Sequence, residues 1–170
     1  SRPVQLQSRP LTLTVLPLSG GSAVYCRDPS RNGELLVNCG SQSAGEFSLR
    51  PFLRWQGIDR LDRLLLTHGN ARQIGGADMV IERFRPREKL ASPLRFRSPN
   101  YRKLMDDDAR AGPWRTIQAG DQFGQWTVLH PQPADRFAQA DDGAVVLMGN
   151  LQGTRVLLLS DLGRPGQEAL

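Results

Sequence analysis

The chain has 170 residues, a length that one hydrophobic core of ordinary size can serve. Hydrophobic residues make up 39% and charged residues 23%, and no apolar run approaches the roughly 20 residues of a membrane-spanning helix. The formal charge of +5, carried almost entirely by arginine, favours an anionic partner, nucleic acid before anionic lipid. We therefore predict one soluble domain over residues 1–170, with residues 1–10 as an extended leader or linker. Because the chain begins at Ser1 without methionine or a charged-then-apolar leader, we expect it to be part of a longer protein.

The first half of the chain predicts a β-meander followed by a helix. Alternating apolar and β-branched residues indicate strands at 11–16, 23–26 and 34–38, separated by Gly- and Pro-containing turns. Pro17 is expected to end the first strand. Apolar residues at three- and four-residue spacing predict a helix over 47–55, with Pro51 in its first turn.

The second half predicts a strand buried on both faces, then helices and further strands. The continuous apolar run at 64–67 is typical of a buried strand, and it leads directly into a loop at 68–76. The other predicted elements are helices at 77–84 and 101–109, a helix beginning after residue 163, and strands at 88–90, 114–117, 126–130, 144–148 and 156–159. This order predicts a layered domain of mixed α and β structure.

One segment carries a recognisable motif. Residues 64–77 read Leu-Leu-Leu-Thr-His-Gly-Asn-Ala-Arg-Gln-Ile-Gly-Gly-Ala, which is similar to the metallo-β-lactamase signature of a strand followed by Thr-His-x-His-x-Asp-His-x-Gly-Gly. Four other segments resemble motifs of the ComEC family of DNA-internalisation proteins, in the same order: residues 16–23, 38–40, 128–131 and 157–162. The chain thus resembles the metallo-β-lactamase-fold domain of that family over nearly its whole length.

The resemblance implies an αββα arrangement of mixed β-sheets flanked by helices, with the last part of the family's fold expected beyond residue 170. It also implies a soluble domain of a polytopic bacterial membrane protein, on the outer side of the cytoplasmic membrane, where single-stranded DNA would be the partner. In intact members the domain is a suspected metal-dependent nuclease.

The metal motif departs from the family pattern at three of its four ligand positions. His68 keeps the first histidine, whereas Asn70, Arg72 and Gln73 stand where the family has histidine, aspartate and histidine. A guanidinium has donors only and cannot ligate a metal. At about 4 Å and an effective dielectric of about 20, its repulsion with a divalent cation would be about 8 kcal/mol. We therefore expect no resident metal.

Among the remaining acids of the family pattern, Asp161 stands at the bridging-carboxylate position, while Pro17, Ser22 and Asn38 replace others. Two hypotheses follow for Asp161. Either Arg72 occupies the vacated metal position and pairs with it, or Arg72 points to solvent and Asp161 caps the following helix.

A basic stretch interleaved with aromatic residues is the candidate nucleic-acid contact, since arginine can neutralise phosphates and aromatic rings can stack on bases. The alternative is a solvated face whose phenylalanines belong to the core, and the acidic run at 106–108 interrupts the charge. The candidate residues are Arg85, Arg87, Lys89, Arg95, Arg97, Arg102 and Lys103.

Two further features have simpler interpretations. His130 before Pro131 could be a ligand or a base, but no Cys, His or acid lies at ligand spacing, so a packed histidine is favoured. For Cys26 and Cys39, two buried unpaired thiols are favoured over a bridge.

The sequence predicts a non-catalytic domain with a structural or DNA-contacting role. The alternative is an active hydrolase or nuclease with a reduced site at His68 and Asp161, which would use zinc or manganese. A protein-interaction domain that inherited the fold is a third hypothesis.

Overall fold

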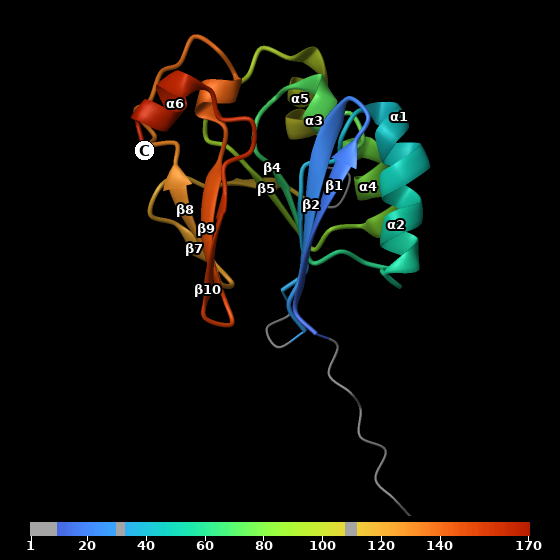
Figure 1. Ribbon diagram of the computed structural model, residues 1–170. Helices are drawn as coiled ribbons and strands as arrows, with labels where there is room; N and C mark the ends of the chain where they lie inside the picture. The colour runs from blue at the N-terminus through green and yellow to red at the C-terminus, as the bar shows by residue number, and fades with distance from the viewer. Residues whose placement is uncertain (1–9, 30–32, 108–111) are drawn as a thin grey trace, which may run out of the picture.

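Two β-sheets packed face to face form the centre of the computed structural model, which describes residues 10–29, 33–107 and 112–170 (Figure 1). Helices cover the outer face of the first sheet, and a short C-terminal helix lies against the second. The arrangement is the predicted αββα layering. Most of the predicted leader at 1–10, the turn at 30–32 and the end of the predicted helix 101–109 lie outside the described residues.

The first sheet is mixed, with the strand order β1-β2-β3-β4-β5-β6. The pairs β1–β2 and β2–β3 are antiparallel, and the remaining pairs are parallel, so the carboxyl ends of β3, β4 and β5 meet at one edge. Its strands are β1 (Thr12–Leu18), β2 (Gly21–Arg27), β3 (Leu35–Val37), β4 (Arg63–Leu66), β5 (Glu88–Ala91) and β6 (Trp114–Thr116).

The second sheet is antiparallel throughout, with the order β10-β9-β8-β7. Its strands are β7 (Gln122–Phe123), β8 (Trp126–His130), β9 (Val146–Leu151) and β10 (Thr154–Leu158). The inner face carries Trp126, Val128 and Leu147, which pack against residues of the first sheet in one buried cluster.

The helices are short, and three of them run without a break from Gln42 to Trp55. They are α1 (Gln42–Ala44), the π-helical turn η1 (Gly45–Leu49), α2 (Arg50–Trp55), α3 (Ala71–Ile74), α4 (Ala77–Phe84), α5 (Pro99–Asp106), the 3₁₀ turn η2 (Asp141–Gly143) and α6 (Arg164–Glu168). No helix in the described part of the chain is long and apolar enough to cross a membrane.

The apolar run of β4 is continuous because both of its faces are buried. Leu64 and Leu66 point into the core between the first sheet and the helices, whereas Leu65 points into the core between the two sheets. Successive side chains of a strand face opposite sides, so a strand with a core on each side needs an apolar residue at every position. Each fully buried leucine contributes about 1.5–3 kcal/mol. The strand therefore joins the two cores and holds the start of the following loop.

Most predicted elements are confirmed, and the differences have local causes. The helix at 77–84 has the predicted bounds, and Pro51 lies in the first turn of α2 as expected. The first strand does not end at Pro17 but continues to Leu18. Because β1 is an edge strand, the missing N–H of proline leaves no partner unpaired there. The predicted helix at 47–55 covers α2 and the end of η1, whereas the pattern did not reveal α1, α3, β7 or η2, all of which are short.

The motif contains the glycine pair Gly75 and Gly76. Neither residue has a positive φ, so glycine is required here by close packing and not by backbone conformation. A Cβ at Gly76 would lie 2.5 Å from the backbone oxygen of Cys39, and one at Gly75 would lie 2.5 Å from the backbone nitrogen of Gln42. The turn between α3 and α4 thus packs directly on the backbone that follows β3 and on α1.

We expect Gly76→Ala to lower the free energy of unfolding by about 1–3 kcal/mol, because the methyl group meets backbone that cannot move aside. Chemical denaturation followed by circular dichroism measures the change. Ser48→Ala, at an exposed position of η1, is the control and should change stability by less than about 0.5 kcal/mol. Equal stabilities of the two variants would contradict the packing argument.

Candidate functional site

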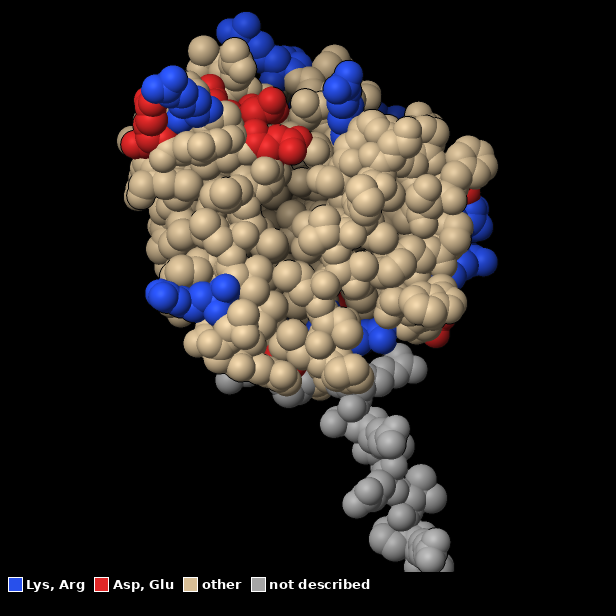
Figure 2. Space-filling model, viewed as in Figure 1, with Lys and Arg blue, Asp and Glu red and all other residues tan. Residues whose placement is uncertain are grey.

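The motif residues gather at the edge where the parallel strands end. Asn38 follows β3 and His68 follows β4, and the Ser160–Asp161 turn after β10 reaches them from the second sheet. Figure 2 shows charged side chains gathered along the upper edge of the molecule, near α6 and α3, above a hollowed centre without charge. Residues of the site line the end of an apolar hollow of about 190 Å³ between the sheets.

His68 is fully buried and is held in one orientation. The backbone N–H of Asn70 donates to its Nδ1 at 3.2 Å, so the neutral ring carries its proton on Nε2. Nε2 has no hydrogen-bond partner, but it lies 3.7 Å from the Oδ1 of Asp141 and 3.8 Å from the Oδ2 of Asp161. Burial lowers the pKa of His68 below its usual value, although the two carboxylates act in the opposite direction.

The side-chain amide of Gln73 forms hydrogen bonds through both its oxygen and its nitrogen. Its Oε1 accepts hydrogen bonds from the backbone nitrogen and the hydroxyl of Ser22, at 3.1 and 3.2 Å, while its Nε2 donates to the Oδ2 of Asp161. The side chain is buried, and the backbone oxygen of Gln73 accepts from Cys39 N–H at 2.7 Å. At a position where the family pattern has histidine, an amide therefore links β2 of the first sheet to the turn after β10.

Asn38 forms a second link between the sheets. It adopts a left-handed backbone conformation, with φ 60°, which asparagine tolerates better than most residues. Its Oδ1 accepts the Thr67 backbone N–H at 3.0 Å, and its Nδ2 donates to the Thr67 hydroxyl at 3.0 Å and to the Ser160 hydroxyl at 3.3 Å. The hydroxyls of Thr67 and Ser160 also bond to each other at 2.7 Å.

The hypothesis that Arg72 pairs with Asp161 is wrong. Arg72 is exposed, and among the described residues its guanidinium is in no ion pair, whereas Asp161 accepts from Gln73. The reason is the short helix α3. Asn70 caps it by accepting the Arg72 backbone N–H at 3.0 Å, and the helical turn places Gln73 on the buried side and Arg72 on the solvent side.

The other hypothesis was that Arg72 points to solvent and that Asp161 caps the following helix. Its first part is confirmed and its second part is wrong. Arg72 does face solvent, as that alternative expects. However, α6 begins after Gly163, and no side chain caps it. The carboxylate of Asp161 points back to Gln73 and His68 instead.

The side chains at this site do not fit a metal pair. The Nδ1 contact with Asn70 leaves the proton of His68 on Nε2, the nitrogen that faces the carboxylates. The amide of Gln73 is engaged at both ends, and Asn70 caps α3. Over residues 10–29, 33–107 and 112–170, no cluster of three or more His, Cys, Asp or Glu side chains has a geometry that could hold a metal ion.

His130 and the cysteines are packed residues, as predicted. His130 is buried, and its Nε2 lies 2.8 Å from the backbone oxygen of Asp142. Cys26 and Cys39 are both free and buried. Burial raises the pKa of Cys26 to about 11 and also raises the pKa of Cys39.

The predicted basic stretch is divided between the two ends of β5. Arg85 and Arg87 precede the strand, and Arg87 pairs with Asp62 at 3.4 Å. Lys89 is wrong as a surface contact, because it is 2% exposed and its ammonium lies 5.0 Å from the centre of the Trp114 ring. The exposed candidates on the site side of the strand are Arg95, Arg97, Arg102 and Lys103.

Sequence reasoning missed three residues that the fold brings to this edge. Asp141 faces His68 from η2, and Arg136 and Phe137 lie in the segment before it. The Arg136-Phe137 pair repeats the Arg-Phe pattern of Arg95-Phe96, which was the available signal. Nothing local marked Asp141.

This architecture is a metallo-β-lactamase fold. The structure resembles a metallo-β-lactamase of Cronobacter sakazakii with a HARLDQ motif, with a TM-score of 0.58, 18% identity and coverage of 86% of this chain and 55% of that one. It also resembles a variant of the FEZ-1 metallo-β-lactamase from Legionella gormanii, with a TM-score of 0.53, 11% identity and coverage of 81% and 55%. At this identity the likeness concerns the fold alone.

A sequence relative gives the narrower relationship. The chain is 26% identical over 175 aligned residues to ComE operon protein 3 of Bacillus subtilis, covering 91% of this chain and 22% of that protein. No family model matches the chain. The relative confirms the resemblance to the ComEC family, and the chain spans about a fifth of the relative's length.

We expect the stability of the protein to fall as the pH decreases through about 6.5, the ordinary pKa of histidine. Because the folded-state pKa of His68 is lowered, the unfolded chain binds the proton first, so unfolding is favoured by up to about 1.4 kcal/mol per pH unit. Denaturation between pH 7.5 and 5.5 should show this slope, and His68→Gln should remove it. Parallel pH profiles of the two proteins would contradict the burial of a neutral imidazole.

Gln73→Glu tests the amide bridge with a side chain of the same size. At neutral pH the new carboxylate would face Asp161 and could no longer donate to it, so we expect a loss of about 1–3 kcal/mol in the free energy of unfolding. The loss should shrink as the pH falls and the introduced carboxylate is protonated. Gln42→Glu, at an exposed position, is the control in the same denaturation series. Equal effects at the two positions would count against the bridge.

Proposed function

We propose that the chain is a non-catalytic metallo-β-lactamase-fold domain of a DNA-uptake membrane protein and that its role is to contact single-stranded DNA. The relationship to ComE operon protein 3 supports the competence context. In that context the domain would lie on the outer side of the bacterial cytoplasmic membrane, attached to a polytopic membrane chain.

The loss of catalysis rests on two replacements together, a cation in place of an aspartate at Arg72 and a hydrogen-bonded amide in place of a histidine at Gln73. The amide of Gln73 satisfies Ser22 and Asp161 at a position where the family pattern has a metal-binding histidine. A buried polar network in which the groups satisfy one another is stable without a cation. The Gln73 amide thus ties the loop to β2 and to the turn after β10 at a position where the family pattern has a metal ligand.

The motif of the Cronobacter neighbour sharpens the argument. Aligned from His68, the letters HARLDQ place glutamine opposite Gln73 and aspartate opposite Arg72. A glutamine at the last position therefore occurs in a protein named as a metallo-β-lactamase. Arg72, which replaces a carboxylate by a cation, is the departure that the neighbour's motif does not share.

One observation favours a second candidate, a hydrolase with a reduced metal site. The Nε2 of His68 has no hydrogen-bond partner and lies within 4 Å of two carboxylates. With its proton on Nδ1, and with the two carboxylates moved from the positions that they have in this structure, this group could ligate one zinc or manganese ion. It would have to give up the Asn70 contact to do so.

Zinc titration of the wild-type chain and of the triple variant Asn70→His, Arg72→Asp, Gln73→His separates the two functions. If the loss of ligands abolished metal binding, the triple variant should bind zinc at least about a hundredfold more tightly than the wild-type chain, because three ligand types are restored on one loop. Isothermal titration calorimetry gives both affinities. Gln122→His, at an exposed position of β7 in the second sheet, controls for added imidazole.

Cleavage of single-stranded DNA by the wild-type chain with manganese or zinc provides the opposing outcome. We expect no cleavage above background. Metal-dependent cleavage that disappears in His68→Ala would replace the non-catalytic proposal by the reduced-site hydrolase.

A further inference from the structure

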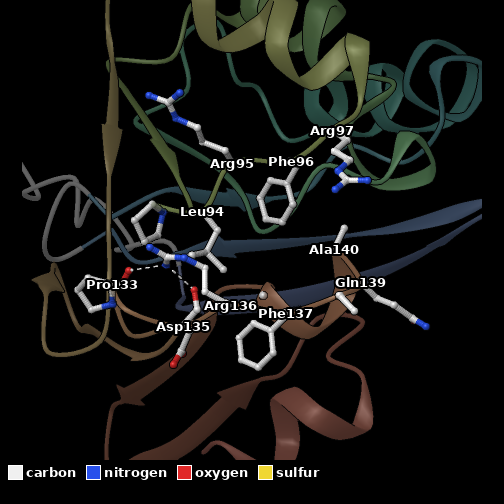
Figure 3. A pocket seen from close by; sticks show the side chains of 13 residues that line it. Leu94, Arg95, Phe96, Arg97, Pro133, Asp135, Arg136, Phe137, Gln139 and Ala140 are labelled. Carbon is white, nitrogen blue, oxygen red and sulfur yellow. Dashed lines mark hydrogen bonds between the residues drawn. The ribbon is translucent and has the colours of Figure 1, made fainter.

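A cavity of about 760 Å³ lies beside the motif residues, between two loops that the sequence does not place together. One wall is the segment Pro93–Arg97 after β5, and the other is formed by residues 133–143 between β8 and β9 (Figure 3). Its volume is in the range of about 300–1,000 Å³ that is usual for small-molecule sites.

The cavity borders the motif on both walls without containing it. Phe96 packs against the backbone of Gly69, where an added Cβ would lie 2.6 Å from the Cβ of Phe96. On the other wall, Ala140 is followed directly by Asp141, whose Oδ1 faces His68 at 3.7 Å. A ligand in the cavity would therefore lie next to the site that relatives use for metals.

The cavity is lined by three arginines and one acid, Asp135. Arg95, Arg97 and Arg136 are exposed, and among the described residues none of their guanidinium groups is in an ion pair. Arg136 is positioned by its own loop, since its Nη1 donates to the backbone oxygens of Asp135 at 2.7 Å and Pro133 at 3.3 Å. The carboxylate of Asp135 accepts Gln132 N–H at 2.8 Å. The arrangement favours an anion.

One aromatic ring comes from each wall, and Figure 3 shows Phe96 and Phe137 both directed toward the interior, with Leu94 between the walls. The rings are supported from behind. Phe96 is edge-on to Tyr101, with ring centres 5.0 Å apart, and Phe137 lies 5.3 Å from the ring of His130. Phe96 is 7% exposed and belongs to the helix-side core, as the alternative for the basic stretch expects, so Phe137 is the ring that can stack on a planar group.

We propose that this cavity binds a nucleotide unit of single-stranded nucleic acid, with a base against Phe137 and the phosphates at Arg95, Arg97 and Arg136. Guanidinium groups beside an aromatic ring match the two parts of a nucleotide, the phosphate and the base. Inorganic phosphate would leave the ring unused, and an acidic peptide offers no planar group for it. The inference rests on the proposed function, because it assumes that the chain contacts DNA.

The test is a fluorescence anisotropy titration of the 170-residue chain with a labelled oligothymidylate of about twelve nucleotides, a length comparable to common single-strand sites. The triple variant Arg95→Ala, Arg97→Ala, Arg136→Ala should bind at least about tenfold more weakly. Its matched control is Arg54→Ala, Arg83→Ala, Arg155→Ala, which removes the same charge from exposed positions elsewhere and should lose less than about threefold.

An abasic oligomer of the same length tests the aromatic part. We expect wild-type chain to bind it about tenfold more weakly than oligothymidylate, and Phe137→Ala to reduce this difference to less than about threefold. Phe47→Ala, at a ring 80% exposed on η1, is the control and should leave the difference unchanged. Thermal melting of each variant confirms that it is folded before its affinity is compared.

The outcomes separate the two proposals. Absence of binding by the wild-type chain would overturn DNA contact and the cavity together. Binding with equal losses in the two arginine variants would leave DNA contact standing and overturn the cavity. Equal affinity for polyglutamate and for oligothymidylate would also overturn it, because the cavity would then select charge without a base.

Discussion

The strand β4 is buried on both faces, and this burial determines where every functional group of the protein can lie. Leu64 and Leu66 belong to the helix-side core, and Leu65 belongs to the core between the sheets. The chain leaving such a strand cannot turn back into either core, so the following residues form a loop at the sheet edge. The parallel neighbours end at the same edge, which brings Asn38 to Thr67, the residue before His68.

At that edge, hydrogen bonds hold together segments that metal ligands hold together in the signature of the fold. Gln73 connects Ser22 to Asp161, and Asn38 connects Thr67 to Ser160. Both amides offer a donor and an acceptor, so each can bridge two groups of opposite hydrogen-bonding character. A carboxylate at these positions offers acceptors only and would need a cation or a proton to do the same. The replacements are therefore suited to a site that is closed by protein contacts.

The proposed nucleotide cavity lies beside the loop in which three residues depart from the metal-ligand pattern of the family. Its walls follow β5 and β8, and the first of them packs directly on the loop of His68. A cationic, aromatic surface needs no metal to bind a phosphodiester chain, because charge and stacking supply the affinity. A surface of this kind does not depend on the metal ligands, and Arg72 also faces solvent.

The sequence by itself determined the layered fold, the family resemblance and the loss of three ligands. Hydrophobic periodicity and residue chemistry are local properties that can be read along the chain. The bounds of α4 and the burial of β4 followed in this way.

Only the tertiary structure decided that Gln73, and not Arg72, meets Asp161, because the orientation of each side chain depends on the short helix α3 and its Asn70 cap. It also brought Asp141 to His68 and Phe137 opposite Phe96. Such contacts join residues that are far apart in the sequence through the packing of two sheets. No local sequence pattern predicts which of these residues will meet.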